Sequence, residues 1–516
     1  MKHKSQPYYL IKKESITIYI LKEMKKLILV ASIIVLSVSN ISSQQKVLTL
    51  EQTIAIACDS SLQAFVSKNL YLSSYWQFKS YKAARLPSLM LNTTPLSYNK
   101  DFTKRYLSDQ NIDVYRQQQS LFSDGSLALT QNIDLTGGSI FINSELGFMK
   151  NIGLLNSTQF NVVPFQIGYQ QNLIGYNGFK WEKKTEPLRY ENAKRKFIYQ
   201  IEEISESCIQ YYFNLAGAQI EYSRAMENLG STDTLYQIGQ KRFEIAAIPK
   251  SELLTLQLDA LNAKNSLRNA KTNLNKAMSA FVTFLNLEKG TEIKLELPEK
   301  LNAAQVSADK ALQYSMMNNP TYLENKTNIL DGEKQVDQNQ KQLYYNASVF
   351  ASVGFNNVAD NWRSAYTNPL RQDNISLGLN IPILDWGVRK GKLNMAKNNL
   401  NVTRLTAKQK EIALQQDVVN TVQDFIIQQD VIKSAETATA IADLAYQATR
   451  ERFIIGENDI SALTLSLNRQ TEAKRNYIEA LKNYWLSYYK IRKLTLFDFE
   501  KNTSLLLKFD NLMKVR

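Results

Sequence analysis

The chain has 516 residues, of which 44% are hydrophobic and 21% charged, a balance that fits a folded protein larger than one compact core. It contains only 18 glycines and 10 prolines, which favours long uninterrupted helices over a loop-rich enzyme. The net charge is +14, but residues 1–43 carry seven lysines and two glutamates and account for +5 of it. The remaining basic residues are interleaved with acidic ones, so nucleic-acid binding is not indicated.

Catalytic chemistry finds little support in this composition. The only histidine is His3, so the rest of the chain lacks the commonest general base and the commonest metal ligand. No nucleophile motif, metal-ligand spacing or glycine-rich phosphate loop is present. Cys58 and Cys208 are too few for a disulfide framework, and the sequence leaves open whether they pair. We therefore expect no enzyme activity, no cofactor and no metal site.

Residues 24–43 have the features of a signal peptide. Two lysines precede the apolar run 27–36, and Ser42 and Ser43 provide small residues for a cleavage site. Residues 1–23 are then expected to lie upstream of the true start of translation. Beyond the leader, no stretch is long and apolar enough for a membrane helix, so a membrane-spanning form would have to be a β-barrel.

Four later segments alternate apolar and polar residues with period two, as strands with two different faces do. Each run is about nine residues long, the length that a tilted strand needs to cross a bilayer. Strands of a soluble sandwich alternate in the same way, so both possibilities remain open. The segments are 126–135, 165–173, 347–355 and 375–383.

The first half of the chain contains an inserted hairpin. Residues 135–139 (LTGGS) are a tight-turn signal between predicted strands at 126–135 and 139–148. Segments 99–125 and 149–161 are then expected to be long external loops. The second half has only two predicted strands, at 346–355 and 374–384.

Most of the remaining sequence predicts very long helices. From about residue 178 to 243 no glycine–proline cluster interrupts the chain, and apolar residues recur every seven positions, as along a coiled-coil seam. At 1.5 Å per residue, about 65 helical residues reach roughly 100 Å. Cys208 lies on this seam and is expected to be buried and inert. The first seam is Ile201, Cys208, Leu215, Tyr222, Leu229, Tyr236 and Phe243, beside Ile204, Tyr211, Ala218 and Ala225. The second is Val418, Phe425, Ile432, Tyr446 and Phe453, beside Ile412, Val419 and Ile426.

The two long helices are related by an offset of 210 residues, a whole number of heptads. Arg242-Phe243, for example, aligns with Arg452-Phe453. Both halves have the order helix, strands, very long helix, turn, helix, so we predict two internal repeats. The repeats are predicted at 44–300 and 301–499, followed by a C-terminal tail at 500–516.

In this arrangement the chain resembles the TolC-like outer-membrane efflux protein family, also called outer membrane factors, from Gln44 to about Phe499. The resemblance implies a mixed membrane protein: a homotrimer whose subunits share one transmembrane β-barrel, usually of twelve strands, continuous with a long periplasmic α-helical coiled-coil barrel. The inserted hairpin would raise the strand number. The motifs that carry the resemblance are 48–52 (LTLEQ), 83–89 (AARLPSL), 381–387 (IPILDWG) and the two tips that begin at Arg242 and Arg452.

The resemblance also implies a function and a location. The family supplies the outer-membrane channel of tripartite efflux or type I secretion systems, with an extension into the periplasm. Such a channel passively conducts substrate to the exterior from a periplasmic adaptor (membrane fusion protein) and an inner-membrane pump, and it contacts outer-membrane lipid but no nucleic acid. The alternative is a periplasmic coiled-coil adaptor or scaffold, which would explain the helices but not the bilayer-length strands. The sequence does not name the cargo.

In that family two helix–turn–helix tips contact the adaptor. Small residues at Ala246, Ala247 and Gly456 would let another helix approach closely, although Gly456 and Pro249 would serve equally to turn the chain between antiparallel helices. The predicted contact residues are Ile245, Ala246, Ala247, Ile248, Pro249, Lys250 and Ser251 in the first tip, and Ile455, Gly456, Glu457, Asn458, Asp459, Ile460 and Ser461 in the second.

Some family members constrict the closed tunnel with acidic residues just past the tip. Glu252 occupies such a place in the first half, whereas Ala462 stands at the matching position in the second. The sequence therefore leaves two interpretations of Glu252 open. It forms a gate together with its copies from two other subunits, or it is an ordinary solvent-exposed glutamate.

Overall fold

The computed structural model divides the chain into two compact units. The first combines Met1–Thr53 with Tyr211–Glu299, and the second combines Ile54–Gln210 with Lys300–Arg516. These boundaries differ from those of the predicted repeats, because one long helix contributes to both units.

The structure describes most of the chain after the predicted leader. The signal peptide at 24–43 and the upstream segment 1–23 lie outside the described residues, as do Gly456, Asn458 and Asp459 of the second tip. The described residues are 46–152, 156–298, 305–455, 457 and 460–509.

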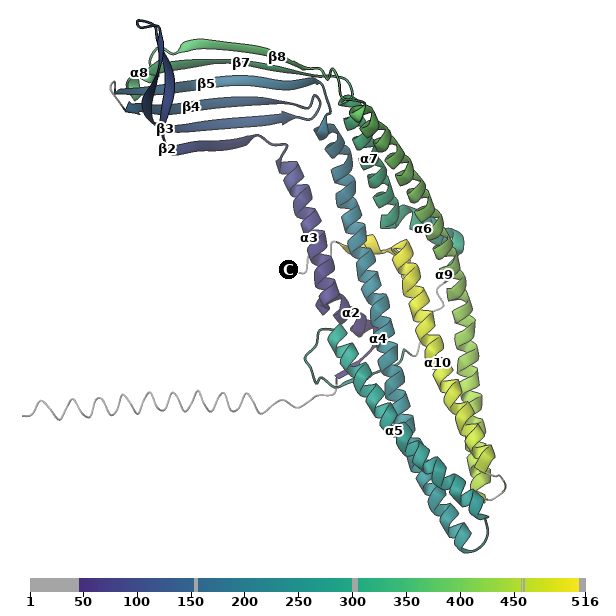
Figure 1. The fold of residues 1–516 in the computed structure, drawn as a ribbon. Coiled ribbons are helices and arrows are strands. Elements are labelled where there is room, and N and C mark those ends of the chain that lie inside the picture. Colours follow the sequence, from purple (N-terminus) through teal and green to yellow (C-terminus); the bar gives the residue numbers. More distant parts are fainter. Residues whose placement is uncertain (1–45, 153–155, 299–304, 456, 458–459, 510–516) are drawn as a thin grey trace, which may run out of the picture. The chain divides into compact units, whose positions relative to one another are not determined.

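The second unit contains one antiparallel sheet of six strands, which lie side by side in Figure 1. In order across the sheet they are β2 (Ser88–Leu107), β3 (Ile112–Ile133), β4 (Gly138–Ile152), β5 (Ser157–Ile174), β7 (Asn346–Ala359) and β8 (Leu370–Asn380). Because β5 pairs with β7, strands from both halves of the sequence form one continuous sheet. β2 and β8 are its two edges.

The prediction of long external loops at 99–125 and 149–161 is wrong. β2 and β3 stay paired as far as Leu107 and Ile112, so this stretch is a long hairpin with a short turn. β4 and β5 likewise stay paired out to Ser157. Period two was hard to recognise in these segments because many polar residues stand on both faces of the strands.

β2 bends near Pro95. The register between β2 and β3 shifts between Thr94 and Ser97, at a residue that has no N–H to give to the ladder. Beyond this point the hairpin turns away from the plane of the other strands (Figure 1). β2 has 20 residues and the opposite edge strand β8 only 11, so the two edges of the sheet differ in length.

Strand register separates the sheet into an apolar and a polar face, since directly paired residues of an antiparallel sheet point to the same side. At the outer end of β8 the apolar face also carries Arg371 and Asp373, which form an ion pair of 3.0 Å. One row of the apolar face is Leu89, Leu129, Ile142, Ile167 and Val353, to which β8 adds Ile375, Leu377 and Leu379. A neighbouring row of the opposite face is Ser88, Thr130, Phe141, Gly168, Ser352 and Asn374.

Helices enter and leave the sheet at one of its ends. The helices of this unit are α3 (Leu62–Ala83), α6 (Ala308–Asn318), α7 (Pro320–Lys341), α8 (Trp362–Ala365), α9 (Val388–Ile455) and α10 (Ile460–Thr495), with the first part of α4 (Gly178–Glu244) and most of α2 (Leu50–Ser60). α9 packs along α10 and, nearer the sheet, along α7 (Figure 1). None of the helices in the described part of the chain has a stretch apolar enough to cross a membrane.

The sequence 381–387 makes the turn from β8 into α9. Asp385 caps the helix, because its carboxylate accepts hydrogen bonds from the backbone N–H groups of Gly387 at 3.0 Å and Arg389 at 3.2 Å. Trp386 and Gly387 both have positive φ, at 54° and 85°. The acidic cap followed by this left-handed turn gives a physical reason for the Asp-Trp-Gly sequence.

The predicted seams are confirmed where the helices have neighbours. Along α9, Val418, Phe425 and Ile432 are no more than 1% exposed. Ile412 and Ile426, from the row beside them, are nearly half exposed in the single chain. One side of α9 therefore packs within the unit, while a second apolar row remains on its surface.

The first unit contains the far part of α4, α5 (Lys250–Phe284) and a two-stranded parallel sheet of β1 (Lys46–Leu48) with β6 (Ile293–Leu295). Tyr212, Phe281 and Leu285 are fully buried in its core. The Tyr212 hydroxyl donates to the Glu296 carbonyl, which ties the β1–β6 sheet to α4. The remaining small elements, in the second unit, are β9 (Phe497–Asp498), β10 (Thr503–Ser504) and the 3₁₀ helix η1 (Leu505–Lys508).

Candidate functional site

The first tip begins where α4 ends in a left-handed turn. The N–H of Ala247 donates to the carbonyl of Arg242 at 2.8 Å, and the N–H of Ala246 donates to that of Phe243 at 2.9 Å. This pair of bonds is the Schellman arrangement, which normally places glycine at the residue with positive φ. Here that residue is Ala246, with φ +57°. The tip therefore turns at a position that is mildly strained for any side chain.

The return helix starts directly after this turn. Pro249 is extended, with φ −73° and ψ 157°, and its carbonyl accepts the first hydrogen bonds of α5. Slightly further from the tip, a Cβ atom added to Gly239 would lie only 2.3 Å from the Cδ1 atom of Leu256. The absent side chain of Gly239 thus allows α4 and α5 to pack closely beside the turn.

Most of the predicted contact residues of the first tip are exposed. Ile245 is 75% exposed, and Ala246, Ala247, Pro249, Lys250 and Ser251 also face solvent, whereas Ile248 is half-buried. Glu252, the candidate gate residue, lies in the first turn of α5 and is half-buried.

An apolar stripe on α5, which begins just past the first tip, was not predicted from the sequence. Leu254, Leu258 and Leu261 are each more than half exposed, and their spacing places them on one side of the helix. The spacing of four and three residues was a usable signal for this stripe.

The turn of the second tip is closed by the same hydrogen bond between residues five positions apart. The N–H of Glu457 donates to the carbonyl of Arg452 at 2.9 Å, in the positions that Ala247 and Arg242 hold in the first tip. Ile455, at the end of α9, is 68% exposed, and Glu457 and Ser461 face solvent. Gly456, Asn458 and Asp459 lie outside the described residues, and Ile460 begins α10.

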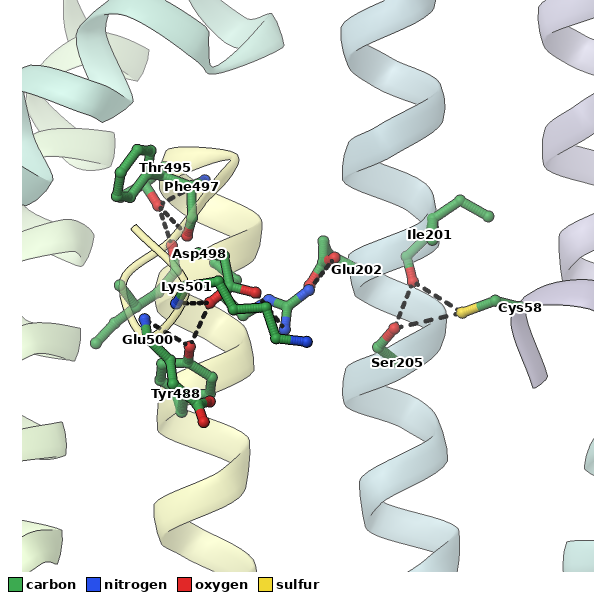
Figure 2. Close-up of polar contacts among 12 residues, drawn as sticks. Cys58, Ile201, Glu202, Ser205, Tyr488, Thr495, Phe497, Asp498, Glu500 and Lys501 are labelled. Atoms are coloured by element: carbon green, nitrogen blue, oxygen red, sulfur yellow. Dashed lines mark hydrogen bonds and ion pairs between the residues drawn. The ribbon is translucent and has the colours of Figure 1, made fainter. Parts of the chain in front are cut away.

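The second unit contains a buried charged network that was not predicted from the sequence. Arg492 of α10 forms ion pairs with Glu202 of α4 at 2.8 Å and with Asp498 at 3.4 Å (Figure 2). The Tyr488 hydroxyl donates to the other oxygen of Asp498 at 2.9 Å. Burial opposes the charge of Arg492, but the neighbouring Glu202, Tyr489 and Asp498 outweigh it and raise the pKa of the guanidinium. Removing one partner from such a buried pair costs about 3–5 kcal/mol, so the network fixes α10 to α4.

The two cysteines are both free thiols in the described structure. Cys208 is fully buried, as predicted from its place on the seam. Cys58 lies 3.5 Å from the hydroxyl of Ser205, which itself donates to the carbonyl of Ile201 (Figure 2). Burial raises the pKa of the Cys58 thiol to about 11 and that of Cys208 further still. Both thiols are therefore poor nucleophiles.

The described part of the predicted C-terminal tail folds back onto the helices. Leu505 and Phe509 are buried, and the Phe509 ring meets Tyr71 of α3 edge-on at 4.9 Å and Phe197 of α4 at 5.9 Å. The tail therefore belongs to the core of the second unit.

Comparison with known proteins identifies the family of this fold. Residues 311–495 match the family model described as "Outer membrane efflux protein". The chain is therefore similar to outer membrane efflux proteins over these residues. No curated protein sequence matches it.

Solved structures with the same fold come from several bacteria. The CmeC outer membrane channel of Campylobacter jejuni has a TM-score of 0.62 and 14% identity, covering 90% of this chain and 89% of that one. The outer membrane protein VceC of Vibrio cholerae has a TM-score of 0.61 and 13% identity, and the match covers 86% of this chain and 95% of VceC. The open-state MtrE outer membrane channel of Neisseria gonorrhoeae has a TM-score of 0.59 and 14% identity, and the match covers 86% of this chain and 88% of MtrE.

The match to this family decides between the functions that the sequence left open. The chain is an outer-membrane efflux channel protein, with helices that extend into the periplasm, rather than a periplasmic adaptor or scaffold. The family consists of channels and not of enzymes. Its members work with a periplasmic adaptor and an inner-membrane pump in tripartite systems.

Proposed function

We propose that three copies of this chain form one duct that conducts substrates passively from the periplasm to the exterior. The observation that carries the proposal is the six-stranded sheet, which has one apolar face and two open edges in each chain. An open edge in lipid leaves backbone N–H and C=O groups without partners, at a cost of several kcal/mol for each group. Pairing β2 of one copy with β8 of the next removes these edges.

The two faces of the sheet support opposite environments for the wall. The row from Leu89 to Val353, continued by Leu377 on β8, is suited to contact outer-membrane lipid. The opposite face, with residues such as Thr130 and Asn374, is suited to line a water-filled lumen. Three copies of a six-stranded sheet give eighteen strands, six more than the twelve that the family resemblance implied.

Exposed apolar rows on the helices also favour assembly. Ile412 and Ile426 on α9, and the leucine stripe of α5 that includes Leu258, lie on helix surfaces that need a neighbouring helix to leave water. In the proposed assembly, these rows pack against further helices of the same tube.

The two tips, 245–251 and 455–461, are proposed to contact the adaptor of the export system. Exposed Ile245 and Ile455 offer apolar anchors at the two turns, and the alanines of the first tip leave room for a partner helix to approach. Glu252 is proposed as a gate residue, where three copies would bring three carboxylates together at the closed end.

Oligomeric state and conductance test the proposal. The mature chain, purified in detergent, should run as a trimer in native mass spectrometry and form ion-conducting channels in planar bilayers. Replacing Ile245 and Ile455 together by Asp should abolish export in cells while leaving the trimer and its channels intact, because only the adaptor contact is lost. A water-soluble monomer that needs no detergent would contradict the duct, and unimpaired export by the tip variant would contradict the adaptor site.

A further inference from the structure

A basic pocket lies where the sheet of the second unit meets its helices. It has a volume of about 500 Å³ and is lined from the ends of β5, α7 and β8 and from the starts of β7 and α9. Its cations are Lys341, Arg389 and Lys392, and no carboxylate stands among its lining residues. The pocket therefore presents positive charge without an acidic group in its wall.

Strand register places this pocket on the polar face of the sheet. Asn346 pairs with Asn380, and Asn172 pairs with Ser348, two residues along the same strand from Asn346. The three asparagines thus share the face that carries Ser352 and Asn374. They add amide donors beside the basic groups on the side proposed to face the lumen.

The two lysines of the pocket are uncommitted, whereas the arginine is fixed. Among the residues that the structure describes, neither Lys341 nor Lys392 has an ion-pair partner within 4.0 Å. Arg389 donates to the carbonyl of Gln342 at 2.9 Å and lies 3.7 Å from Asp385. Two ammonium groups are therefore available to a ligand beside a guanidinium of fixed position.

Helix electrostatics strengthen the positive potential. α9 begins beside the pocket with Arg389 and Lys390 in its first turn, and the Asp385 carboxylate that caps this helix offsets only one of these charges. α4 has no acidic residue in its first turn. The N-terminus of a helix already carries about half a positive charge, so basic residues there weaken the helix and concentrate positive potential. An anion bound nearby would relieve this repulsion.

We infer that the pocket binds the anionic groups, carboxylate or phosphate, of solutes that move along the polar face of the sheet, and that it biases the duct towards anionic cargo. The inference rests on the proposed function, because the polar face lines a lumen only if copies of the chain close a barrel. Three copies would then place six free lysine ammonium groups around the lumen where the sheet joins the helices.

Binding of inorganic pyrophosphate to the purified full chain in detergent tests the pocket directly, without requiring conduction. We expect the double variant Lys341→Gln/Lys392→Gln to bind about tenfold more weakly than the wild type in isothermal titration calorimetry. The matched control is Lys326→Gln/Lys397→Gln, which removes the same charge from the same two helices at exposed positions outside the pocket lining. Equal affinity in the wild type and both variants would overturn the inference.

Ion selectivity in planar bilayers tests the bias of the duct. In a salt gradient the wild type should be more permeable to chloride than to potassium. The chloride-to-potassium permeability ratio should be at least about threefold lower in the pocket variant and unchanged in the control. If the pocket variant instead changes only the retention of phosphatidylglycerol during purification, the lysines bind lipid headgroups and the inference falls. A wild type that binds pyrophosphate through these lysines but forms no channel would refute the proposed duct and leave the anion pocket standing.

Discussion

At the residue scale, the first tip contains a position whose backbone does not suit its side chain. Ala246 adopts φ +57° at the point where glycine is preferred, and the two Schellman hydrogen bonds hold it there. A left-handed conformation costs a non-glycine residue about 1 kcal/mol. The turn therefore keeps a methyl group at the tip in spite of this strain, and the methyl faces solvent.

Replacing Ala246 by Gly should stabilise the tip by about 1 kcal/mol, because the glycine adopts positive φ without the steric clash. Hydrogen exchange of the amides around the turn, measured on the detergent-solubilised protein, reports this as slower exchange. Ala247→Gly is the control, since Ala247 is not among the residues with positive φ and should gain nothing. Equal protection in both variants would contradict the strain argument.

Burial controls the chemistry of the Cys58 thiol. Its pKa is raised from 9.0 to about 11, so at pH 8 the folded protein holds roughly 100-fold less thiolate at this site than the unfolded chain. Because the folded state keeps its proton longer, Cys58 favours folding below about pH 9, and this contribution declines as pH rises from 9 towards 11.

Alkylation kinetics check this expectation. In a Cys208→Ala variant, iodoacetamide should modify Cys58 at least about 100-fold more slowly in the folded protein at pH 8 than after denaturation. The rate in the folded protein should keep rising with pH up to about 11. A rate that levels off near pH 9 would show an ordinary, accessible thiol.

At the scale of single elements, strand register decides which side chains meet which solvent. Leu377 and Ser376 are neighbours on β8 but point to opposite faces, as their partners Val349 and Phe350 on β7 show. Phe350 stacks with Phe141 of β4 at a ring distance of 5.5 Å, so the polar face also carries an aromatic pair. Gly168 of β5 makes this possible, because a Cβ there would lie 2.2 Å from the Phe141 ring.

An arginine scan of this pair tests the assignment of the two faces. Leu377→Arg should lower the stability of the assembled barrel by about 2–4 kcal/mol, the cost of a charge on a lipid-facing position near the bilayer centre. Ser376→Arg should be tolerated, since its side chain would point into water. The yield of heat-resistant oligomer on gels after membrane extraction reports the stability of both variants. If Ser376→Arg lowers this yield more than Leu377→Arg does, the two faces are assigned the wrong way round.

The same scale shows why some elements were predictable and others were not. Period seven revealed the α9 seam through Val418 and Phe425, because burial of one helix side imposes that spacing on the sequence. The outer parts of β2 and β3 escaped because both of their faces carry polar residues, which leaves no alternation to detect. Arg492 and Glu202 escaped for a different reason. They lie 290 residues apart, and no local pattern marks a charged pair that only the fold brings together.

At the scale of the whole molecule, the long hairpin of β2 and β3 would set the size of the proposed barrel wall. β2 and β3 are an antiparallel pair at one edge of the sheet, and both α3 before β2 and the turn after β3 lie at the end where the helices attach. Removing the pair would therefore let α3 lead directly into β4, which begins at that same end. The remaining sheet, β4-β5-β7-β8, has four strands, and three copies of it would give the twelve strands usual in the family.

Deletion of residues 88–135 is accordingly expected to leave an assembled but narrower trimer. The diameter of a barrel grows roughly in proportion to its strand number, so going from eighteen to twelve strands should shrink the barrel by about a third. Averaged electron-microscopy projections along the channel axis measure this diameter directly. The control shortens only the outer hairpin, replacing 97–121 by a two-residue turn, and should keep the full width because β8 is too short to pair with that part of β2. An unchanged diameter after the larger deletion would mean that β2 and β3 lie outside the wall.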